Sequence, residues 1–193
     1  MNPKEKVKVF DLEISLIKND QIKEFAIRAT ELLPDYFFII PASTSKKYHP
    51  NFASGDGGLV RHTQAAVRLA YEMFRMEIFN YFTSNEKDLI LASLLLHDGK
   101  KAGYNGVHTV TEHPILMGKF LRNSKILSDI IPEEWLNIIC QNIERHMGAW
   151  TKDYKTGKEI LEKPQNKMNN FVHICDYIVS RKMMEIDLDA KLS

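Results

Sequence analysis

The sequence predicts an all-α protein built as a single domain. Apolar residues recur at helical spacing from residue 21 to residue 184, and only residues 7–14 alternate in a way that suggests a strand. The chain of 193 residues has the length of one ordinary domain, and its core needs no disulfide or metal for stability. We therefore expect about six or seven helices.

Composition limits the classes of partner and compartment. The net charge of +1 provides no overall field for a long nucleic acid duplex or a membrane surface. No apolar run approaches the roughly 20 residues of a membrane helix, and the lysine-rich start lacks the apolar segment of a signal peptide. Cys140 and Cys175 have no CxxC spacing and are expected as buried thiols. These features predict a cytoplasmic protein with no membrane partner.

The first half of the chain contains three expected helices. Residues 21–33 carry an apolar stripe that ends at Pro34, and residues 59–79 form a second periodic segment with His62 in its first turn. The third helix, residues 89–97, follows a turn in which Ser84 is a candidate N-cap. Its almost continuous apolar character predicts that it is the central and most buried helix.

The second half shows clear helix boundaries. Pro114 suits the first helical position, which places His113 at the N-cap of a helix over residues 115–121. Pro132 opens the next helix, which ends near His146 before a glycine. Residues 149–166 form a lysine-rich loop, and residues 167–184 form the last helix. This helix carries Asp176 among apolar residues, where a carboxylate requires a metal or a basic partner.

The feature around which the chain is organised is the doublet His97-Asp98, which follows the apolar run of residues 90–96. Imidazole and carboxylate are both good ligands for divalent cations. Four further residues of ligand type accompany the doublet: His62, His113, His146 and Asp176. His108 is an alternative to His113, and His173 is expected beside the site or on the surface.

The order His…His-Asp…His…His…Asp resembles the HD-domain superfamily of metal-dependent phosphohydrolases, and most closely its two-metal members. The resemblance covers roughly residues 41–183, and similar proteins carry a Ser/Thr-Lys-Tyr-His-Pro stretch before a Gly-Gly-Leu-Val-Arg-His segment. It implies a helical HD domain over residues 41–184, an N-terminal extension with a first packing helix over 1–40, and a tail over 185–193. The arrangement is most similar to the HD module of bacterial 3′→5′ exoribonucleases, which also carry an OB domain that this sequence lacks.

The sequence departs from the family at two points. The family usually has His-Asp-Ile-Gly-Lys, whereas this chain has His-Asp-Gly-Lys-Lys, so either Lys100 or Lys101 takes the usual place of the lysine. The Gly-Tyr-Pro signature of cyclic-di-GMP phosphodiesterases does not follow the doublet. This second departure argues against that activity.

The resemblance implies a specific ligand set for two divalent ions. His62, His97, Asp98 and Asp176 would hold one ion, and Asp98 would bridge to a second held by His113 and His146. Nitrogen and oxygen ligands without thiolate suit Mn, Fe, Ni, Co, Zn or Mg. A metal-bound hydroxide would attack phosphorus.

Cations and polar loop residues complete the expected site. Arginine and lysine can neutralise phosphate, which makes Lys100, Lys101 and Arg145 catalytic candidates together with Asp98, and Arg181 a candidate for substrate binding. The long loop of residues 42–58 ends just before His62 and offers four further substrate-binding candidates: Ser43, Ser45, Lys47 and His49. Aromatic residues in this loop and in 149–166 can stack a nucleobase: Tyr48, Phe52, Trp150 and Tyr154.

These patterns predict a metal-dependent phosphohydrolase that acts on a phosphate ester of a nucleotide or a single-stranded nucleic acid end. The alternative is a catalytically weak HD-fold module that binds a nucleotide or metal as a sensor or in protein interactions. A third hypothesis is a helical domain whose histidines are coincidental. The sequence leaves the substrate, the metal and the oligomeric state open.

Overall fold

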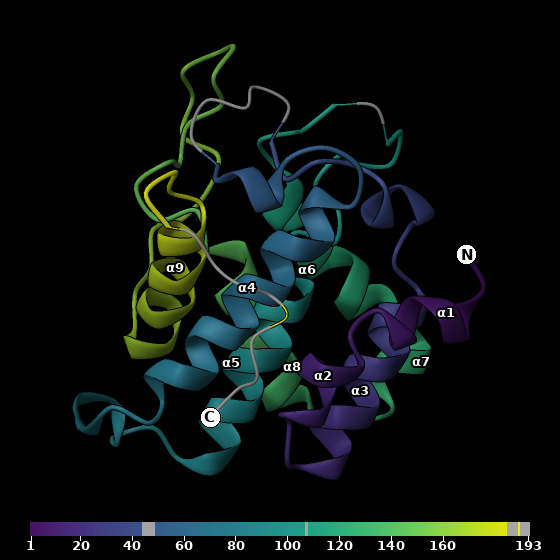
Figure 1. The fold of residues 1–193 in the computed structure, drawn as a ribbon, viewed down its shortest axis with the longest axis vertical. Helices are drawn as coiled ribbons and strands as arrows, with labels where there is room; N and C mark the ends of the chain where they lie inside the picture. Colours follow the sequence, from purple (N-terminus) through teal and green to yellow (C-terminus); the bar gives the residue numbers. More distant parts are fainter. Residues whose placement is uncertain (44–48, 107, 185–188, 190–193) are drawn as a thin grey trace.

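The fold is all-α, as predicted (Figure 1). The computed structural model describes residues 1–193 except 44–48, 107, 185–188 and 190–193. The α-helices of the described residues are α1 (Pro3–Lys8), α2 (Asp11–Ser15), α3 (Asp20–Glu31), α4 (Gly58–Met73), α5 (Ser84–Leu96), α6 (His113–Asn123), α7 (Lys125–Ser128), α8 (Glu133–Glu144) and α9 (Lys167–Val179). The short 3-10 helices are Asp35–Phe38, Asn51–Ala53 and Glu77–Phe79. The β-structure recorded in the same residues is one isolated bridge, between Lys152 and Glu159.

Helix α5 lies at the centre of the bundle, and every residue from Asp88 to Leu96 is buried. It packs against α3, α4, α8 and α9, so its apolar side chains find partners on all sides. The helix begins earlier than expected because Thr83, not Ser84, is its N-cap. Thr83 accepts a hydrogen bond from the Glu86 amide, and the Glu86 carboxylate accepts one from the Thr83 amide.

The strand predicted for residues 7–14 is wrong, since the chain forms α1 and α2 there. Asn2 caps α1 in a capping box with Glu5, and Pro3 follows at the first helical position. Phe10 and Ile14 are four residues apart and both buried, so they share one helical face. The alternation that suggested a strand spans only a few residues, and the helix-start residues Asn2, Pro3 and Glu5 were overlooked. Helix α1 packs on α3, and α2 contacts α3, α4 and α5.

Several other boundaries differ from the predicted ones. Helix α4 ends at Met73 instead of residue 79, and α9 ends at Val179 instead of residue 184. His113 is the first residue of α6, with Glu112 at the N-cap, and Pro132 is itself the N-cap of α8. The one-turn helix α7 was not predicted, because four residues are too few to show a period.

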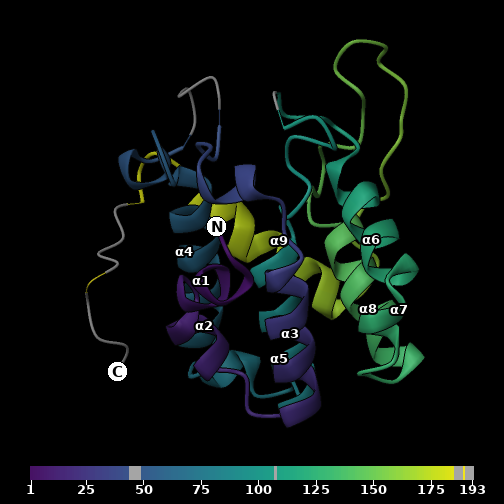
Figure 2. The ribbon, with the colours of Figure 1, turned by 90° about the vertical axis from the view of Figure 1, so that its right-hand side faces the viewer.

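The long connections gather at one end of the bundle. Figure 2 shows the segments between α5 and α6 and between α8 and α9 rising beyond the helices on the same side. His97, the C-cap of α5, and His113, the first residue of α6, therefore lie at this end. The predicted ligands are thus close in space although they are far apart in sequence.

Candidate metal centre

The six predicted ligands come together in one cluster, in which five residues are buried and Asp176 is partly buried. Three overlapping sets have ligand atoms within 4.8 Å of one another: His62, His97 and Asp98; His97, His146 and Asp176; and Asp98, His113 and His146. The side chains come from α4, α5, α6, α8 and α9 or from residues just after these helices, which is five helices instead of the expected four. We name these six residues the His/Asp cluster.

His113, and not the alternative His108, contributes to the His/Asp cluster. His113 is 1% exposed and its Nε2 atom lies 3.0 Å from Asp98 Oδ1. His108 lines a separate cavity together with Tyr104 and Tyr154. The helix start at Pro114 fixes this choice, because it holds His113 at the mouth of α6 while His108 remains in the preceding loop.

Tight backbone packing sets the position of His62 at the start of α4. Gly57 precedes the helix with φ of 69°, a left-handed conformation that glycine adopts without strain. Gly58 packs against the Ala53 carbonyl so closely that a Cβ atom has no room there. These two glycines let the chain turn directly into α4. His62 follows near the start of this helix, on its buried face.

Three histidines of the cluster are oriented in the same way by the backbone. The Nδ1 atom of each lies close to the carbonyl oxygen three residues earlier, at 2.6 Å for His97, 2.7 Å for His113 and 2.7 Å for His146. A carbonyl only accepts, so Nδ1 carries the proton and donates it. In its neutral form each ring therefore presents the Nε2 lone pair to the centre, as metal-ligating histidines do.

This orientation leaves acceptor atoms facing one another. His113 Nε2 and His146 Nε2 are 3.4 Å apart, and they lie 3.0 and 3.6 Å from Asp98 Oδ1. His97 Nε2 is buried and has no hydrogen-bond partner. Buried acceptors without a donor between them are costly, and a cation at this point would satisfy all of them. The residues therefore fit a metal ion.

The two oxygens of Asp98 face different halves of the cluster. Oδ1 faces His113 and His146, whereas Oδ2 lies 3.5 Å from His97 Nε2 and 3.9 Å from His62 Nε2. Asp176 closes the second half, with its Oδ1 atom 2.9 Å from His62 Nε2 and 3.5 Å from His97 Nε2. Each half of the cluster therefore has one oxygen of Asp98 that could take part in holding an ion.

Both carboxylates are held in the charged form. Burial alone raises the pKa of Asp98, but the Lys101 ammonium and the neighbouring His97 and His113 outweigh it and hold that pKa well below its ordinary value. Burial likewise raises the pKa of Asp176, but the contact with His62 and the nearby His97 outweigh it and hold that pKa well below its ordinary value. Charged carboxylates are the form that metals bind.

The histidines divide into two protonation classes. Burial and the nearby His97 lower the pKa of His146 to about 3, and burial with the Lys101 charge lowers that of His113. Burial also lowers the pKa of His97, but the neighbouring Asp98 and Asp176 carboxylates more than offset it and raise the value. His113 and His146 are thus neutral, the form in which an imidazole nitrogen can bind a metal ion.

The structure distinguishes the two lysines that follow the doublet. Lys101 Nζ lies 3.0 and 2.9 Å from the two oxygens of Asp98. Lys100 instead packs its ammonium 4.1 Å from the centre of the Phe120 ring, and burial lowers its pKa. Of the two, Lys101 is therefore the lysine that lies beside the cluster.

Arg145 also points elsewhere, although it precedes a cluster residue. It donates to Glu162 in the 149–166 segment and ties that segment to the end of α8. His173 supports the cluster from outside, since its Nδ1 donates to the His146 carbonyl at 2.7 Å. Its ring also fills the space above Gly148, where no side chain fits.

A cavity of about 260 Å³ opens beside the cluster. Asp176 of the cluster lines it, and so does Lys101, which contacts Asp98, so the cavity leads directly to the ligands. Its other lining residues are His49, Met147, Trp150, His173, Tyr177, Ser180 and Arg181. We name this space the cluster cavity.

The candidate substrate-binding residues have different outcomes. His49 lies in the cluster cavity with its ring centre 5.5 Å from that of His62, and burial together with His62 lowers its pKa to about 4. Arg181 also lines this cavity and stacks its guanidinium 4.4 Å from the Tyr177 ring centre. Ser43 is partly buried, while Ser45 and Lys47 lie outside the described residues.

Tyr177 and Ser180 were not predicted at the site. The signal was present, because Ser180 follows Asp176 by four residues and so shares its helical face. Tyr177 stacks on Trp150 with ring centres 5.6 Å apart, a contact between α9 and a loop that no local pattern reveals.

Comparisons of the chain with protein-family models, with curated proteins and with solved structures found no match. The buried His/Asp cluster in an all-helical fold is compatible with an HD-type metal site. Among the described residues, no helix has both the length and the apolar character needed to cross a bilayer.

Proposed function

We propose that this chain is a metal-dependent phosphohydrolase acting on a phosphate ester of a nucleotide or a nucleic acid end. One observation carries the proposal: four histidines and two carboxylates converge at a cavity that also contains two cations, Lys101 and Arg181. Metal ligands and phosphate-neutralising groups on one cavity wall are the parts that phosphoryl hydrolysis requires.

The residues present suit two divalent ions of the series Mn, Fe, Ni, Co, Zn and Mg. Asp98 would be shared, with His113 and His146 on one side and His62, His97 and Asp176 on the other. Bound there, such ions supply Lewis acidity and a water of lowered pKa. The protein keeps these ligands buried, which strengthens every charge interaction at the reacting phosphate.

The walls of the cluster cavity support a substrate that contains a nucleobase. Trp150 and Tyr177 are stacked and remain 51% and 38% exposed, so part of their aromatic surface is accessible to a ligand. A stacked base contributes roughly 1–3 kcal/mol. Arg181 adjoins both rings, and Lys101 lies nearer the cluster, so phosphate and base have separate contacts.

One observation favours the non-enzymatic alternative. Lys101 contacts both oxygens of Asp98, which a shared ligand must turn toward the ions. A lysine that kept this pairing would leave room for fewer ions and favour a nucleotide- or metal-binding sensor. The two functions differ in turnover and not in binding.

The test is hydrolysis by the full chain, loaded with each metal in turn, of a panel of phosphate esters. The panel contains nucleoside mono-, di- and triphosphates, cyclic nucleotides, short single-stranded RNA and DNA, and sugar phosphates. We expect metal-dependent release of phosphate or nucleotide from substrates that carry a base. The Asp98→Ala variant is the inactive control, and Asp129→Ala, an exposed carboxylate elsewhere, is the active one.

Two outcomes would change the conclusion. Activity confined to sugar phosphates would remove the argument from base stacking. A protein that holds its ions and binds nucleotides but hydrolyses no member of the panel would be the sensor.

A further inference from the structure

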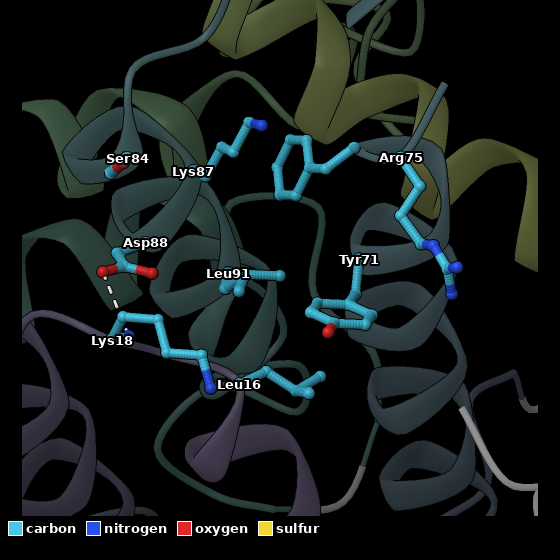
Figure 3. A pocket seen from close by; sticks show the side chains of 9 residues that line it. Leu16, Lys18, Tyr71, Arg75, Ser84, Lys87, Asp88 and Leu91 are labelled. Carbon is cyan, nitrogen blue, oxygen red and sulfur yellow. Dashed lines mark hydrogen bonds between the residues drawn. The ribbon is translucent and has the colours of Figure 1, made fainter. Parts of the chain in front are cut away.

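Two cavities that are larger than the cluster cavity differ in what their polar groups do. The first, of about 290 Å³, lies between the end of α4 and the first half of α5, where Tyr71 and Leu91 line it (Figure 3). The carboxylate that lines it, Asp88, accepts hydrogen bonds from the backbone amides of Lys18 and Asn19, at 3.1 and 2.7 Å. This carboxylate therefore serves the fold, because it joins the segment before α3 to α5.

The second cavity, of about 510 Å³, lies between the two long connections at the cluster end of the bundle. Tyr104 and His108 line it from the segment between α5 and α6, and Tyr154 and Lys155 line it from the 149–166 segment. Figure 2 shows both segments rising beyond the helices at the same end. We name this space the loop cavity.

The loop cavity adjoins the His/Asp cluster through one segment of the chain. That segment begins at Lys101 and ends at His113, and both side chains contact Asp98, at 2.9 and 3.0 Å. Val110 lies between them and lines the loop cavity. Its amide donates to the Lys101 carbonyl at 3.0 Å, and its carbonyl accepts from His113 Nδ1 at 2.7 Å. A ligand in the loop cavity therefore lies next to the backbone that positions two contacts of Asp98.

Both walls of the loop cavity are held in place by the protein itself. On one side, the Tyr36 hydroxyl donates to the Gly103 carbonyl at 2.7 Å. A Cβ atom on Gly106, which has φ of 70°, would lie only 2.8 Å from the Tyr36 ring. On the other side, the Asp153 carboxylate accepts from the Thr156 amide at 2.7 Å and closes the turn between them. A site that is formed before binding loses less conformational entropy when it takes up a ligand.

Exposed aromatic side chains are concentrated around the loop cavity and the cluster cavity. The described part of the chain has five exposed tyrosine, tryptophan or phenylalanine side chains. Tyr104 and Tyr154 line the loop cavity at 70% and 76% exposure, Trp150 and Tyr177 line the cluster cavity, and Tyr81 lies elsewhere. Exposed rings beside a nucleic acid site stack with successive bases of a single strand, whatever its sequence.

The two cavities are within reach of one short strand. Trp150 and Tyr154 are four residues apart, so their Cα atoms are at most about 14 Å apart. About four stacked nucleotides cover the same distance, at roughly 3.4 Å each. A strand with one base at Trp150 therefore reaches Tyr154 with a base further along.

The charges at the loop cavity are nearly balanced. Lys155 Nζ lies 5.7 Å from the centre of the Tyr154 ring, close enough to contact the phosphate of a nucleotide stacked there. The carboxylate of Glu112 lines the same cavity and opposes this charge. Base stacking should therefore contribute more to binding here than phosphate contacts do.

We propose that the loop cavity is a second base-binding subsite, and that the substrate is a single-stranded nucleic acid end several nucleotides long. Its terminal nucleotide occupies the cluster cavity, and a base further along the strand stacks on Tyr104 and Tyr154. This inference rests on the function proposed for the His/Asp cluster. It selects a nucleic acid end, and not a free nucleotide, as the substrate of that site.

Turnover as a function of strand length tests the subsite. The metal-loaded full chain is given dinucleotides and hexanucleotides, as oligouridylate and as oligothymidylate, so that RNA and DNA are compared as sources of the single strand. We expect kcat/KM to be about tenfold higher for the hexanucleotide of the preferred kind, because only that length reaches the second stack.

Variants of the two tyrosines localise this length preference. Tyr104→Ala and Tyr154→Ala should each remove most of it, whereas Tyr154→Phe keeps the ring and should keep the preference. Tyr81→Ala is the matched control, because Tyr81 is an exposed tyrosine between α4 and α5. We expect the ratio of the two kcat/KM values to be unchanged in this control.

Binding separates a failure of this inference from a failure of the proposed function. Calorimetry with Asp98→Ala, in which no turnover is expected, measures the affinity for the same oligonucleotides without chemistry. Addition of Tyr154→Ala to this variant should weaken hexanucleotide binding by about tenfold. Such weakening, in a protein whose wild type hydrolyses nothing, would retain the loop cavity as a nucleic acid site and overturn the phosphohydrolase.

Three results would overturn the inference and leave the proposed function intact. Equal kcat/KM values for dinucleotides and hexanucleotides would remove the second subsite. A length preference that persists when Tyr104 and Tyr154 are both replaced by alanine would place the strand elsewhere. Faster hydrolysis of free mononucleotides than of either oligonucleotide would assign a nucleotide substrate to the cluster.

Discussion

Two groups of buried polar side chains share helices α5, α8 and α9 and differ in whether their hydrogen bonds are complete. The first group is Ser93, Asn142 and Asn169. Asn169 donates to Asn142 at 2.8 Å, Asn142 donates to Ser93 at 3.1 Å, and Ser93 donates to a carbonyl of its own helix at 2.6 Å. The Asn169 oxygen accepts from the Gln165 amide. Each member has a partner.

The second group, the His/Asp cluster, is open in the sense that its hydrogen bonds are incomplete. Its rings turn acceptor atoms toward one another, and His97 Nε2 and His62 Nδ1 are buried without a partner. Buried networks that are complete rigidify a core, whereas incomplete ones signal a missing partner. The first group satisfies its polar atoms within the protein, whereas the second leaves ligand atoms facing one another, so the second group points to an ion.

The two groups are also connected by helix geometry. Ser93 and His97 are four residues apart, as are Asn142 and His146, and Asn169 precedes Asp176 by seven. Each pair therefore shares a helical face. The complete network holds α5, α8 and α9 in register about one or two turns away from the ligands and so pre-positions them.

The largest expected effect is in the open group. Asp98→Ala removes the carboxylate whose two oxygens face both halves of the cluster, so we expect both ions to be lost. Metal analysis of the purified variant measures this directly, with Asp129→Ala as the matched control. Addition of a chelator should lower the unfolding temperature of the wild type and leave that of Asp98→Ala unchanged. Retention of one ion by Asp98→Ala would contradict the shared role.

His146→Ala should have the next largest effect. Its Nε2 faces Asp98 Oδ1 together with His113, so its removal should weaken one ion position and leave the other intact. Metal titration should then show one tight and one weak site. Loss of both ions in this variant, equal to the loss in Asp98→Ala, would show that the cluster holds its ions as one unit.

Asn142→Leu tests the complete network. It leaves Ser93 and Asn169 without partners, so we expect the free energy of unfolding to fall by about 1–3 kcal/mol, with the metal-to-protein ratio unchanged. The triple variant Ser93→Ala, Asn142→Leu, Asn169→Leu removes every partner at once and should recover part of this loss. A loss of metal in Asn142→Leu without loss of stability would show that the network acts on the ligands alone.

The smallest effect is expected at Cys175, which adjoins Asp176 in sequence. Burial raises the pKa of this thiol, and its Sγ lies 3.9 Å from Met73 Sδ in the core. It therefore stays protonated and does not compete for an ion. We expect Cys175→Ala to keep the full metal content, with only a small loss of stability. Reduced metal content would place a thiolate in the cluster.

Much of the fold and of the candidate site follows from patterns that the sequence shows directly. A run such as Ile90–Leu96 has no polar face, which predicts a helix covered on all sides. The order of ligand-type residues, together with Pro114 at a helix start, identified the side chains that the structure brings together. The two cysteines are free and buried, as expected.

Other features depend on contacts that no local pattern reveals. Asn142 and Asn169 are polar residues within helices, and only tertiary packing shows that both are buried. The choice between Lys100 and Lys101 depends on the turn after α5, which sends one side chain to Asp98 and the other to Phe120. The early helices were missed because a short alternation was taken for a strand, whereas the capping box at Asn2 starts a helix there.

The burial of α5 has a consequence for exchange with solvent. Amides in a helix covered on every side exchange their hydrogens only when the whole molecule opens, so α5 should be the slowest segment to take up deuterium. The doublet His97-Asp98 is attached to the end of this segment. An ion that binds the cluster would therefore be expected to enter from the cluster cavity, past Asp176 and Trp150, while α5 stays closed.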